Sequence, residues 1–316
     1  MKIQLITPAP LSFNNGNKIT ATRWSRILRK LGHKVAVQQN YTNARCDLII
    51  ALHALKSHKS IRKFHDNHPD RPMIVALTGT DLYRDIKNHD EAQESLRLAS
   101  RLVVLQAMAV NELPRNLHGK TRVIYQSAEP YPARRFYTNG KFKVAVIGHL
   151  RDEKDPLRTA VAARELPPTS KIEVLHVGRA LDDDLRKAAQ AEAEKNPRYR
   201  WAGELPYWMT RRVLARSQLV VISSKMEGSS NVLSEALASS VPVLASKIPG
   251  LMGTLGKDYP GYFPVGDTGE LTRLLLKVER NPLFYRSLQR RCARLAVLVR
   301  PSRELSAWKA LLNELQ

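Results

Sequence analysis

Two glutamates, Glu227 and Glu235, flank a turn of small polar residues in the second half of the chain. A short β-branched run, 219–222, precedes the turn and indicates a buried strand, and the apolar residues after the turn recur with the spacing of one helix face. A fully helical path between the two carboxylates would separate them by ~12 Å along its axis. They are therefore poorly placed as an acid–base pair for one bond, and better placed to hold the two ends of a long ligand.

The turn between the glutamates offers backbone N–H groups and good helix N-caps. Its residues, with the first of the helix, are Gly228, Ser229, Ser230, Asn231 and Val232. A second strand, 241–245, follows, so the loop of this strand–loop–helix–strand unit opens at the carboxyl edge of a parallel sheet, where phosphate binds. A sugar nucleotide, with a diphosphate between two hydroxyl-rich ends, fits the pattern. Two solvated glutamates on a surface helix explain the same residues equally well.

The chain has 316 residues, 43% hydrophobic and 25% charged, which is enough for two domains with separate cores. No apolar run approaches the length of a membrane span, and the N-terminus turns polar too soon for a signal peptide, so we expect a cytoplasmic protein with no membrane partner. Cys46 and Cys292 lack metal or redox spacing and read as small buried hydrophobes. His65 and His68 lack a third ligand nearby, so we expect no metal and no cofactor. Oligomeric state is left open.

The net charge of +22 makes nucleic acid an alternative partner. However, the basic residues are spread over nearly every expected helix, and aromatic residues make up only 6% of the chain. No basic stripe with interleaved aromatic residues is present. We therefore interpret the charge as a basic surface around a site for anionic substrates, and keep nucleic-acid binding as the weaker alternative.

Residues 1–139 alternate strands and helices, which indicates an α/β domain. Its strands are expected at 3–6, 35–37, 47–52, 73–77, 102–105 and 123–125. Two of the loops that follow these strands carry polar groups suited to an acceptor. They contain Asn14, Asn15, Gly16, Asn17 and Lys18 in one loop, and Thr80, Asp81 and Arg84 in the other. A plain Asn/Gly turn explains the first loop, and a helix N-cap competes evenly for the second.

A Pro- and Gly-containing stretch without periodicity, 126–140, indicates an interdomain hinge. We therefore expect a first domain at 1–139, a second at 140–296, and a final helix at 297–316 that returns to the first domain. The second domain opens with a strand at 142–147.

Three strands of the second domain end in residues that suit a nucleotide. The strand 142–147 is followed by Gly148, His149, Arg151 and Lys154; the strand 172–177 by Gly178; and the strand 199–201 by Gly203, Glu204 and Leu205. A glycine directly after a strand, with cations beyond it, can grip a diphosphate. The competing interpretation is that His149 only packs and that Lys154 pairs with a neighbouring acid.

The Glu-x7-Glu spacing, with Gly228 after the first glutamate and Pro-Val-Leu-Ala-Ser at 242–246, resembles the donor-site signature of retaining, family-4-like glycosyltransferases of the GT-B fold. The resemblance is good over 142–280. It implies two Rossmann-like domains facing a central cleft, with Glu235 on the ribose, Glu227 near the donor sugar and 203–205 on the nucleobase. Gln126 lies in a segment that resembles the family's crossing between domains, and it is expected on the acceptor side.

Two positions depart from this family. Residue 149 is histidine where the family has a phosphate-binding arginine, so Arg151, or a protonated His149, would take that role beside Lys154. The loop at 14–18 lacks the usual Gly-Gly pair. The rest of the donor signature is intact.

A closer resemblance extends over five segments: 8–21, 51–54, 75–83, 148–156 and 258–263. They are similar to the selenosugar synthases of selenoneine biosynthesis, which join selenium from selenophosphate to the anomeric carbon of a UDP-sugar, usually UDP-N-acetylglucosamine. Nothing in composition or spacing indicates selenium. The sugar and the stereochemistry at the anomeric carbon are not determined by the sequence.

The second resemblance implies a metal-independent transferase with UDP-sugar and selenophosphate as substrates. The residues expected at the chemical step are Glu227, Lys154, Arg151 and Asp81, and Lys18, Arg23 or Arg84 would hold the acceptor phosphate. An ordinary glycosyltransferase with a hydroxyl acceptor shares every donor-site feature. A sugar-phosphate isomerase or a phosphorylase fits the Glu-x7-Glu arrangement less well.

Overall fold

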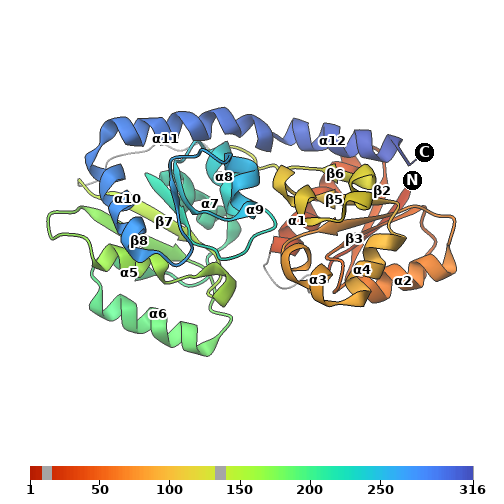
Figure 1. The fold of residues 1–316 in the computed structure, drawn as a ribbon, viewed down its shortest axis with the longest axis horizontal. Coiled ribbons are helices and arrows are strands. Elements are labelled where there is room, and N and C mark those ends of the chain that lie inside the picture. The colour runs from red at the N-terminus through yellow and green to blue at the C-terminus, as the bar shows by residue number, and fades with distance from the viewer. Residues whose placement is uncertain (9–15, 132–139, 316) are drawn as a thin grey trace. The chain divides into compact units, whose positions relative to one another are not determined.

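The computed structural model describes residues 1–8, 16–131 and 140–315. It shows two compact units, each built on a parallel sheet with helices against it (Figure 1). Unit 1 comprises Met1–Gln126, Glu227–Ser229 and Pro301–Gln316, and unit 2 comprises Ser127–Met226 and Ser230–Arg300. The expected α/β class with two Rossmann-like sheets is confirmed.

The sheet of unit 1 has the order β2-β1-β3-β4-β5-β6 in the described part of the chain, and each pair is parallel. Its strands are β1 (Lys2–Ile6), β2 (Lys34–Gln38), β3 (Leu48–Leu52), β4 (Met73–Leu77), β5 (Arg101–Val104) and β6 (Thr121–Val123). Because all of these strands run the same way, their carboxyl ends lie along one edge of the sheet. The loops after β3 and β4, which are neighbours in the sheet, therefore come together there.

Alternation along the strands of unit 1 supplies two apolar faces. In β3, Leu48, Ile50 and Leu52 join one buried cluster, and Ile49 and Ala51 join another. Both faces are covered by helices. Consequently the central strands read as continuous apolar runs rather than as alternating ones, which is the pattern of a parallel sheet buried on both sides.

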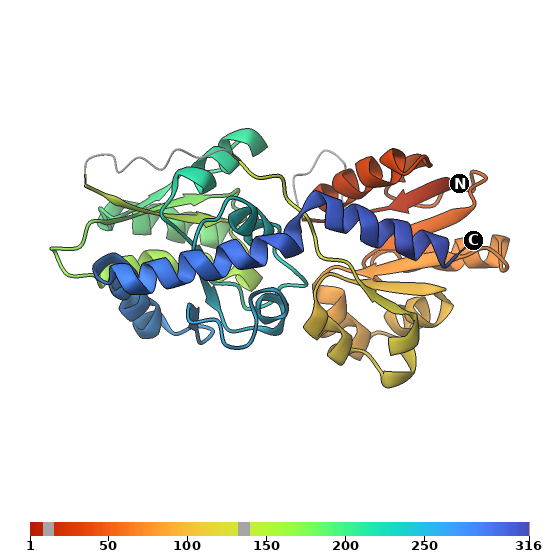
Figure 2. The same ribbon diagram turned by 90° about the horizontal axis from the view of Figure 1, so that it is seen from above.

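The helices of unit 1 are α1 (Gly16–Lys30), α2 (His58–Asn67), the π-helix η1 (Asp81–Asp85), α3 (Ile86–Asn88), α4 (Asp90–Leu98), the 3-10 helices η2 (Ala107–Glu112) and η3 (Arg115–Lys120), and α12 (Pro301–Asn313). Helix α12 lies beside α1 (Figure 2). The rings of Trp24 and Trp308 meet edge to face with centroids 4.7 Å apart. Glu304, which is buried, accepts from Trp24 Nε1 at 2.7 Å and pairs with Arg23 at 3.1 Å.

The sheet of unit 2 has the order β12-β11-β10-β7-β8-β9 in the described residues, again with parallel pairs. Its strands are β7 (Phe142–Ile147), β8 (Ile172–Val177), β9 (Tyr199–Trp201), β10 (Leu219–Ile222), β11 (Val243–Ser246) and β12 (Tyr262–Phe263). From β7 the following strands, β8 and β9, extend the sheet to one side, and from β10 the strands β11 and β12 extend it to the other side. The loops after these two strands thus flank the topological switch point, where open α/β sheets bind ligands.

The helices of unit 2 are the 3-10 helix η4 (Asp152–Lys154), α5 (Arg158–Arg164), α6 (Asp183–Lys195), α7 (Tyr207–Arg216), α8 (Asn231–Ala238), α9 (Pro249–Leu255), α10 (Thr268–Arg280), α11 (Pro282–Leu295) and the 3-10 helix η5 (Ala296–Val299). A single apolar cluster runs through the strands and the helices that pack on them. It includes Cys292, and Cys46 belongs to a core cluster of unit 1, so both cysteines are free and buried as expected.

Two expected strands begin two residues away from those observed. The strand expected at 123–125 is β6 at Thr121–Val123, and the strand expected at 241–245 is β11 at Val243–Ser246. Thr121 and Arg122 pair with Leu102 and Val103, so the register of the sheet, not apolar content, defines β6. No helix in the described ranges is both long and apolar enough to cross a membrane.

Candidate functional site

The loops that follow β7, β8 and β9 are tied to one another through their backbones. Gly148 N–H donates to Val177 O at 2.9 Å, and Gly178 N–H donates to Gly203 O at 2.8 Å. A Cβ on Gly178 would lie 1.8 Å from Gly148 O and 2.9 Å from His149 N, which no side chain tolerates. The glycine expected at the end of β8 is thus required by the close approach of a neighbouring loop.

A buried histidine, His176, contacts the loop at Gly148 from the side of the protein core. Its Nε2 lies 3.1 Å from Gly148 O, and its Nδ1 lies 3.0 Å from the hydroxyl of Tyr199. Burial lowers the pKa of His176 to about 4, so the ring is neutral at pH 7. A neutral ring that donates from Nε2 to the carbonyl and accepts at Nδ1 from the tyrosine satisfies both bonds. We therefore regard His176 as an internal brace of the Gly148 loop.

The cations expected at the donor phosphates lie on the loop 148–155. His149 Nδ1 accepts from Arg179 N–H at 3.1 Å, which fixes the ring against the loop after β8. Arg151 is exposed and lies 4.0 Å from Glu153. Lys154 is half-buried at the end of η4, where its carbonyl accepts from Ser223 Oγ at 3.1 Å. The loops after β7 and β10 are therefore joined, and they carry two cations at the switch point.

Helix α8 begins as expected from its polar turn. Ser230 is the N-cap, and its hydroxyl accepts from Leu233 N–H at 3.3 Å. Glu235 lies in the middle of this helix and is buried. Its Oε1 lies 3.0 Å from the hydroxyl of Tyr207 and 3.5 Å from Nη1 of Arg211. The buried carboxylate is thus ion-paired with an equally buried guanidinium.

The turn before α8 divides between the two units. The segment Glu227–Ser229 is grouped with unit 1, and Ser230 onward with unit 2. A Cβ on Gly228 would lie 2.4 Å from Thr78 O, so glycine is required for the approach to the loop after β4. Glu227 is buried, and its charge adds to the effect of burial in raising the pKa of Tyr83. The two glutamates of the motif thus belong to different units.

In unit 1 the loops after β3 and β4 are joined by Asp81, which is fully buried. Its carboxylate accepts from Thr78 N–H at 2.9 Å and Gly79 N–H at 2.8 Å in its own loop, and from Ala54 N–H at 3.1 Å in the other loop. The carboxylate is thus used up in hydrogen bonds to backbone N–H groups of two loops, which is a structural task. This geometry argues against the catalytic role expected for Asp81.

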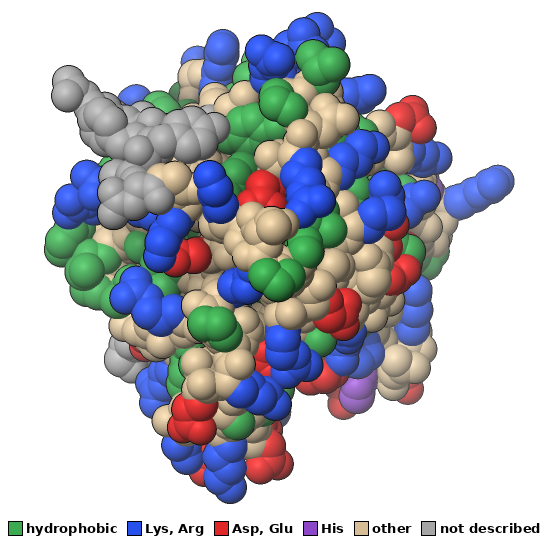
Figure 3. Space-filling view, turned by 90° about the vertical axis from the view of Figure 1, so that its left-hand side faces the viewer, with side chains coloured by type: hydrophobic (Ala, Val, Ile, Leu, Met, Phe, Trp, Pro, Cys, Tyr) green, Lys and Arg blue, Asp and Glu red, His purple; other side chains and the backbone are tan. Residues whose placement is uncertain are grey.

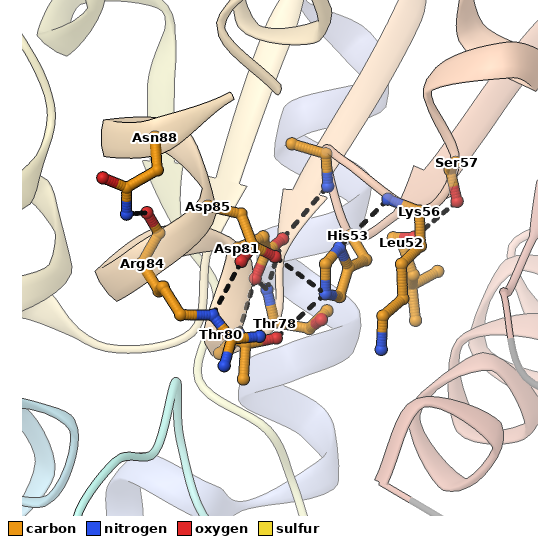
Figure 4. Close-up of polar contacts among 12 residues, drawn as sticks. Leu52, His53, Lys56, Ser57, Thr78, Thr80, Asp81, Arg84, Asp85 and Asn88 are labelled. Atoms are coloured by element: carbon orange, nitrogen blue, oxygen red, sulfur yellow. Dashed lines mark hydrogen bonds and ion pairs between the residues drawn. The ribbon is translucent and has the colours of Figure 1, made fainter. Parts of the chain in front are cut away.

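Beside Asp81 lies a polar cluster of His53, Thr80, Arg84 and Asp85 (Figure 4). His53 Nε2 is 3.0 Å from Thr80 Oγ1 and 3.6 Å from Asp85 Oδ2. Arg84 Nε donates to the other oxygen of Asp85 at 3.0 Å. Burial lowers the pKa of His53 more than the neighbouring carboxylates raise it. Because two loops 27 residues apart meet here, the cluster is a candidate acceptor site with a neutral histidine at its centre.

The remaining expected acceptor residues have different surroundings. Asn14 and Asn15 lie outside the described residues, and Gly16, Asn17 and Lys18 form the start of α1. Gln126 is buried, and its Nε2 donates to Thr20 Oγ1 at 2.6 Å, which indicates a structural role. The pairing of Arg23 with buried Glu304 likewise favours a structural role for that arginine.

On the nucleobase side, Gly203 has φ +66°, Glu204 is exposed and Leu205 is half-buried. Sequence reasoning included His53 in the segment 51–54 but gave it no role, and it did not single out Asp85. The available signal was a histidine placed directly after an apolar strand, in the same edge position as the glycines of unit 2.

Two features bear on the alternative readings. Within 1–8, 16–131 and 140–315, no three His, Cys, Asp or Glu residues form a group that could hold a metal ion. On the face drawn in Figure 3, lysine and arginine side chains are interspersed with acidic, apolar and other residues and do not form one continuous stripe. That distribution matches a generally basic surface better than a nucleic-acid track.

The chain matches a known protein family. The family described as "Glycosyl transferases group 1" matches residues 131–296, which is just over half of the chain. Among curated proteins, "Glycosyltransferase 1 domain-containing protein 1" of Xenopus tropicalis is 27% identical over 286 residues, covering 79% of this chain and 79% of its own length.

Solved structures show a similar fold. Sucrose-phosphate synthase from Thermosynechococcus elongatus has a TM-score of 0.82 at 16% identity, over 99% of this chain and 98% of its own. HepE from Anabaena, solved in complex with UDP and glucose, has a TM-score of 0.75 at 16% identity, over 99% of this chain and 100% of its own. A glycosyltransferase from Rickettsia africae has a TM-score of 0.76 at 12% identity, over 99% and 98% of the two chains. These structures have the GT-B fold and, like this chain, consist of two Rossmann-like domains.

Proposed function

The chain belongs to the glycosyl transferases group 1, and from this premise we propose that it transfers the sugar of a UDP-sugar to the selenium atom of selenophosphate, forming a 1-selenosugar. UDP-N-acetylglucosamine is the proposed donor. The proposal has a donor part, which depends on unit 2, and an acceptor part, which depends on resemblance over short segments. The two parts are supported by different observations and can fail separately.

The donor part is supported by the loops at the switch point of unit 2. Gly148 is fixed by His176 and by the close approach of Gly178, so its loop presents a rigid backbone to a diphosphate. Arg151 and Lys154 follow on the same loop. The bond from Ser223 Oγ to Lys154 O joins this loop to the one after β10, which leads to the capped N-terminus of α8. HepE, which shares the fold, was solved with UDP and glucose bound. A UDP-sugar fits these features as donor, with Glu235 on the ribose hydroxyls.

The acceptor part is supported by the sequence similarity of 8–21, 51–54 and 75–83 to selenosugar synthases. Two of these segments contain the residues of the polar cluster in unit 1, His53 and Thr80. The net charge of +22 also suits a reaction between two anions, which repel one another unless cations surround them. A selenophosphate acceptor therefore agrees with both the local sequence and the overall charge.

In the proposed reaction, selenium attacks the anomeric carbon and forms a C–Se bond as the bond from that carbon to the diphosphate oxygen breaks. UDP leaves with the bonding electrons, and its charge is balanced by Arg151, Lys154 and the N–H groups at the start of α8. Water then hydrolyses the Se–P bond, releasing phosphate and the selenosugar. Selenium in selenophosphate is already an anionic nucleophile, so no strong base is required.

The observation that carries the function is the donor loop pattern within a chain of this family. The test mixes the full chain with UDP-sugars and selenophosphate, and measures UDP release and selenium-bearing sugar by mass spectrometry. Release of UDP together with a 1-selenosugar is expected. If UDP is released only when a hydroxyl acceptor is supplied, the chain is an ordinary glycosyltransferase and the selenium part is wrong.

Replacing Glu235 with alanine tests the donor part directly. Loss of a hydrogen bond between a carboxylate and ribose is expected to raise the Kd for UDP about tenfold, which is ~1.4 kcal/mol. Titration calorimetry of UDP into both proteins measures this change. Glu194→Ala, at an exposed position of α6, is the matched control and should bind UDP as the parent does. Unchanged UDP binding in Glu235→Ala would contradict the ribose role.

A further inference from the structure

The hydroxyl of Thr80 is held in a defined orientation by His53. The backbone N–H of Lys56 lies 3.3 Å from His53 Nδ1, which makes Nδ1 an acceptor. Because the pKa of His53 is lowered and the ring is neutral, its one N–H proton is on Nε2. That proton points to Thr80 Oγ1 at 3.0 Å, so the threonine oxygen accepts and its own O–H proton is turned elsewhere. Thr80 is thus prepared to donate to a ligand.

Backbone geometry at the same place is unusual for non-glycine residues. His53 has φ +75°, in the left-handed region, at the end of β3. The chain just after Thr80 forms the π-helix η1, Asp81–Asp85. Left-handed non-glycine residues and π-helical turns both concentrate at functional sites, where contacts with the surrounding structure stabilise the strained backbone. Here the left-handed residue, His53, is hydrogen-bonded to Thr80, and the π-helix begins at the residue after Thr80.

Around Thr80 the acidic side chains are buried and the basic side chains are exposed. The negative groups, Asp81 and Asp85, are almost fully buried and are bonded to backbone amides and to Arg84 respectively. The positive groups, Arg84 and Lys56, are exposed, with 53% of the Arg84 side chain accessible. Figure 4 shows these two side chains on either side of the His53–Thr80 pair. A ligand that approaches Thr80 therefore meets cations.

We propose that Thr80, Arg84 and Lys56 form a binding site for a phosphate-type oxyanion, with His53 as a positioning residue that orients the Thr80 hydroxyl. The inference rests on the proposed function in one respect, since it assigns the site to the phosphoryl group of the acceptor. The hydroxyl donates to one oxygen, and the two cations neutralise the charge. The chemical class of the ligand is a tetrahedral phosphoryl or thiophosphoryl anion.

The site is tested by binding, without turnover. Inorganic phosphate and thiophosphate are titrated into the full chain by calorimetry, and UDP is titrated in parallel. Thr80→Val keeps the shape but removes the hydroxyl, and it is expected to raise the Kd for both anions about tenfold. Thr80→Ser restores a hydroxyl and should bind within about twofold of the parent. Thr42→Val, at an exposed threonine of the same unit, is the control.

The role of His53 is tested by coupling. His53→Asn, which tolerates a left-handed backbone, is expected to weaken anion binding about as much as Thr80→Val. The double variant should be no weaker than either single variant, because both remove the same donor. A merely structural effect of His53 would add to the loss at Thr80 and would lower the urea denaturation midpoint as well. Independent, additive losses would overturn the positioning role.

The outcomes separate this inference from the proposed function. If the parent protein binds neither phosphate nor thiophosphate, or if Thr80→Val and Arg84→Gln bind them as the parent does, the oxyanion site is wrong. If the variants lose anion binding while selenophosphate yields no selenosugar, the site stands and the selenium acceptor is wrong. In each case an unchanged urea denaturation midpoint shows that the variants are folded.

Discussion

The carboxyl edges of the two sheets are built in different ways. In unit 2, the loops after β7, β8 and β9 are joined backbone to backbone, as in the bond from Gly178 N–H to Gly203 O. In unit 1, they are joined through a buried side chain, because Asp81 accepts from amides of the loops after β3 and β4. The same topology is therefore fixed by glycine and close approach in one unit, and by a buried charge in the other.

Two buried histidines show the same contrast. His176 contacts a backbone carbonyl and a tyrosine, whereas His53 contacts a hydroxyl and a carboxylate. Burial lowers the pKa of both rings. A backbone junction is insensitive to most substitutions except those that add a Cβ, while a side-chain junction changes with the identity of each residue. Under the proposed function, the backbone junctions of unit 2 would hold the diphosphate of the donor, and the side-chain junctions of unit 1 would lie at the acceptor.

The largest expected effect comes from Gly178→Ala. The new Cβ would lie 1.8 Å from Gly148 O, so the two loops must separate. We expect the free energy of unfolding to fall by about 3 kcal/mol and UDP affinity to fall with it. Urea denaturation and calorimetry measure the two effects. Gly119→Ala, where nothing lies within 4 Å of the new Cβ, should change stability by less than about 0.5 kcal/mol. Equal effects of the two variants would contradict the close-approach argument.

A smaller effect is expected at the corresponding junction of unit 1. Asp81→Asn removes a buried charge that satisfies three backbone N–H groups, and places an amide NH₂ against one of them. The free energy of unfolding should fall by about 2.5 kcal/mol, with UDP affinity preserved. Denaturation with urea at pH 7 tests this. Asp66→Asn, in an exposed pair with Arg62, should have almost no effect. A variant at Asp81 as stable as this control would show that the backbone bonds do not depend on the charge.

The pH dependence of stability sharpens the contrast further. A pKa near 4 in the folded protein, against an ordinary value of 6.5, means that the unfolded chain binds the proton more tightly. Stability is therefore full above pH 6.5 and is lost as the pH falls toward 4, by about 2 kcal/mol between pH 6.5 and 4.5. Urea titrations across this range should show a shallower slope for His176→Gln. The burial of His53 acts in the same direction, so part of the slope should remain; parallel curves for parent and variant would rule out His176 as a source.

Much of the sheet framework could be predicted from the sequence. The strands at 142–147, 172–177 and 219–222 have the predicted bounds, because each is an apolar run ended by small or polar residues. The N-terminus of α8 was also located, since Ser230 is a favourable N-cap. β6 was misplaced because Thr121 and Arg122 are not apolar, and their strand conformation depends on pairing with β5.

The internal contacts of the candidate site could not be predicted in the same way. Sequence reasoning placed Glu235, Lys154 and Thr80 at loop or helix positions on the sheet edges. It did not find that Arg211 pairs with Glu235, or that His53 lies against Thr80 and Asp85. These contacts depend on the register of neighbouring strands and on the direction of individual side chains. The π-helix at Asp81–Asp85 could not be predicted either, because five residues are too few to show a hydrophobic periodicity.

The discontinuity of unit 1 has a consequence for synthesis on the ribosome. Trp24, near the start of the chain, completes its packing against Trp308 and its hydrogen bond to Glu304, which are translated some 280 residues later. The early strands must therefore wait, with part of their apolar surface uncovered, until α12 has emerged. Unit 2 is made in between and can fold first, so nascent chains stalled before residue 301 should be the ones that depend most on chaperones.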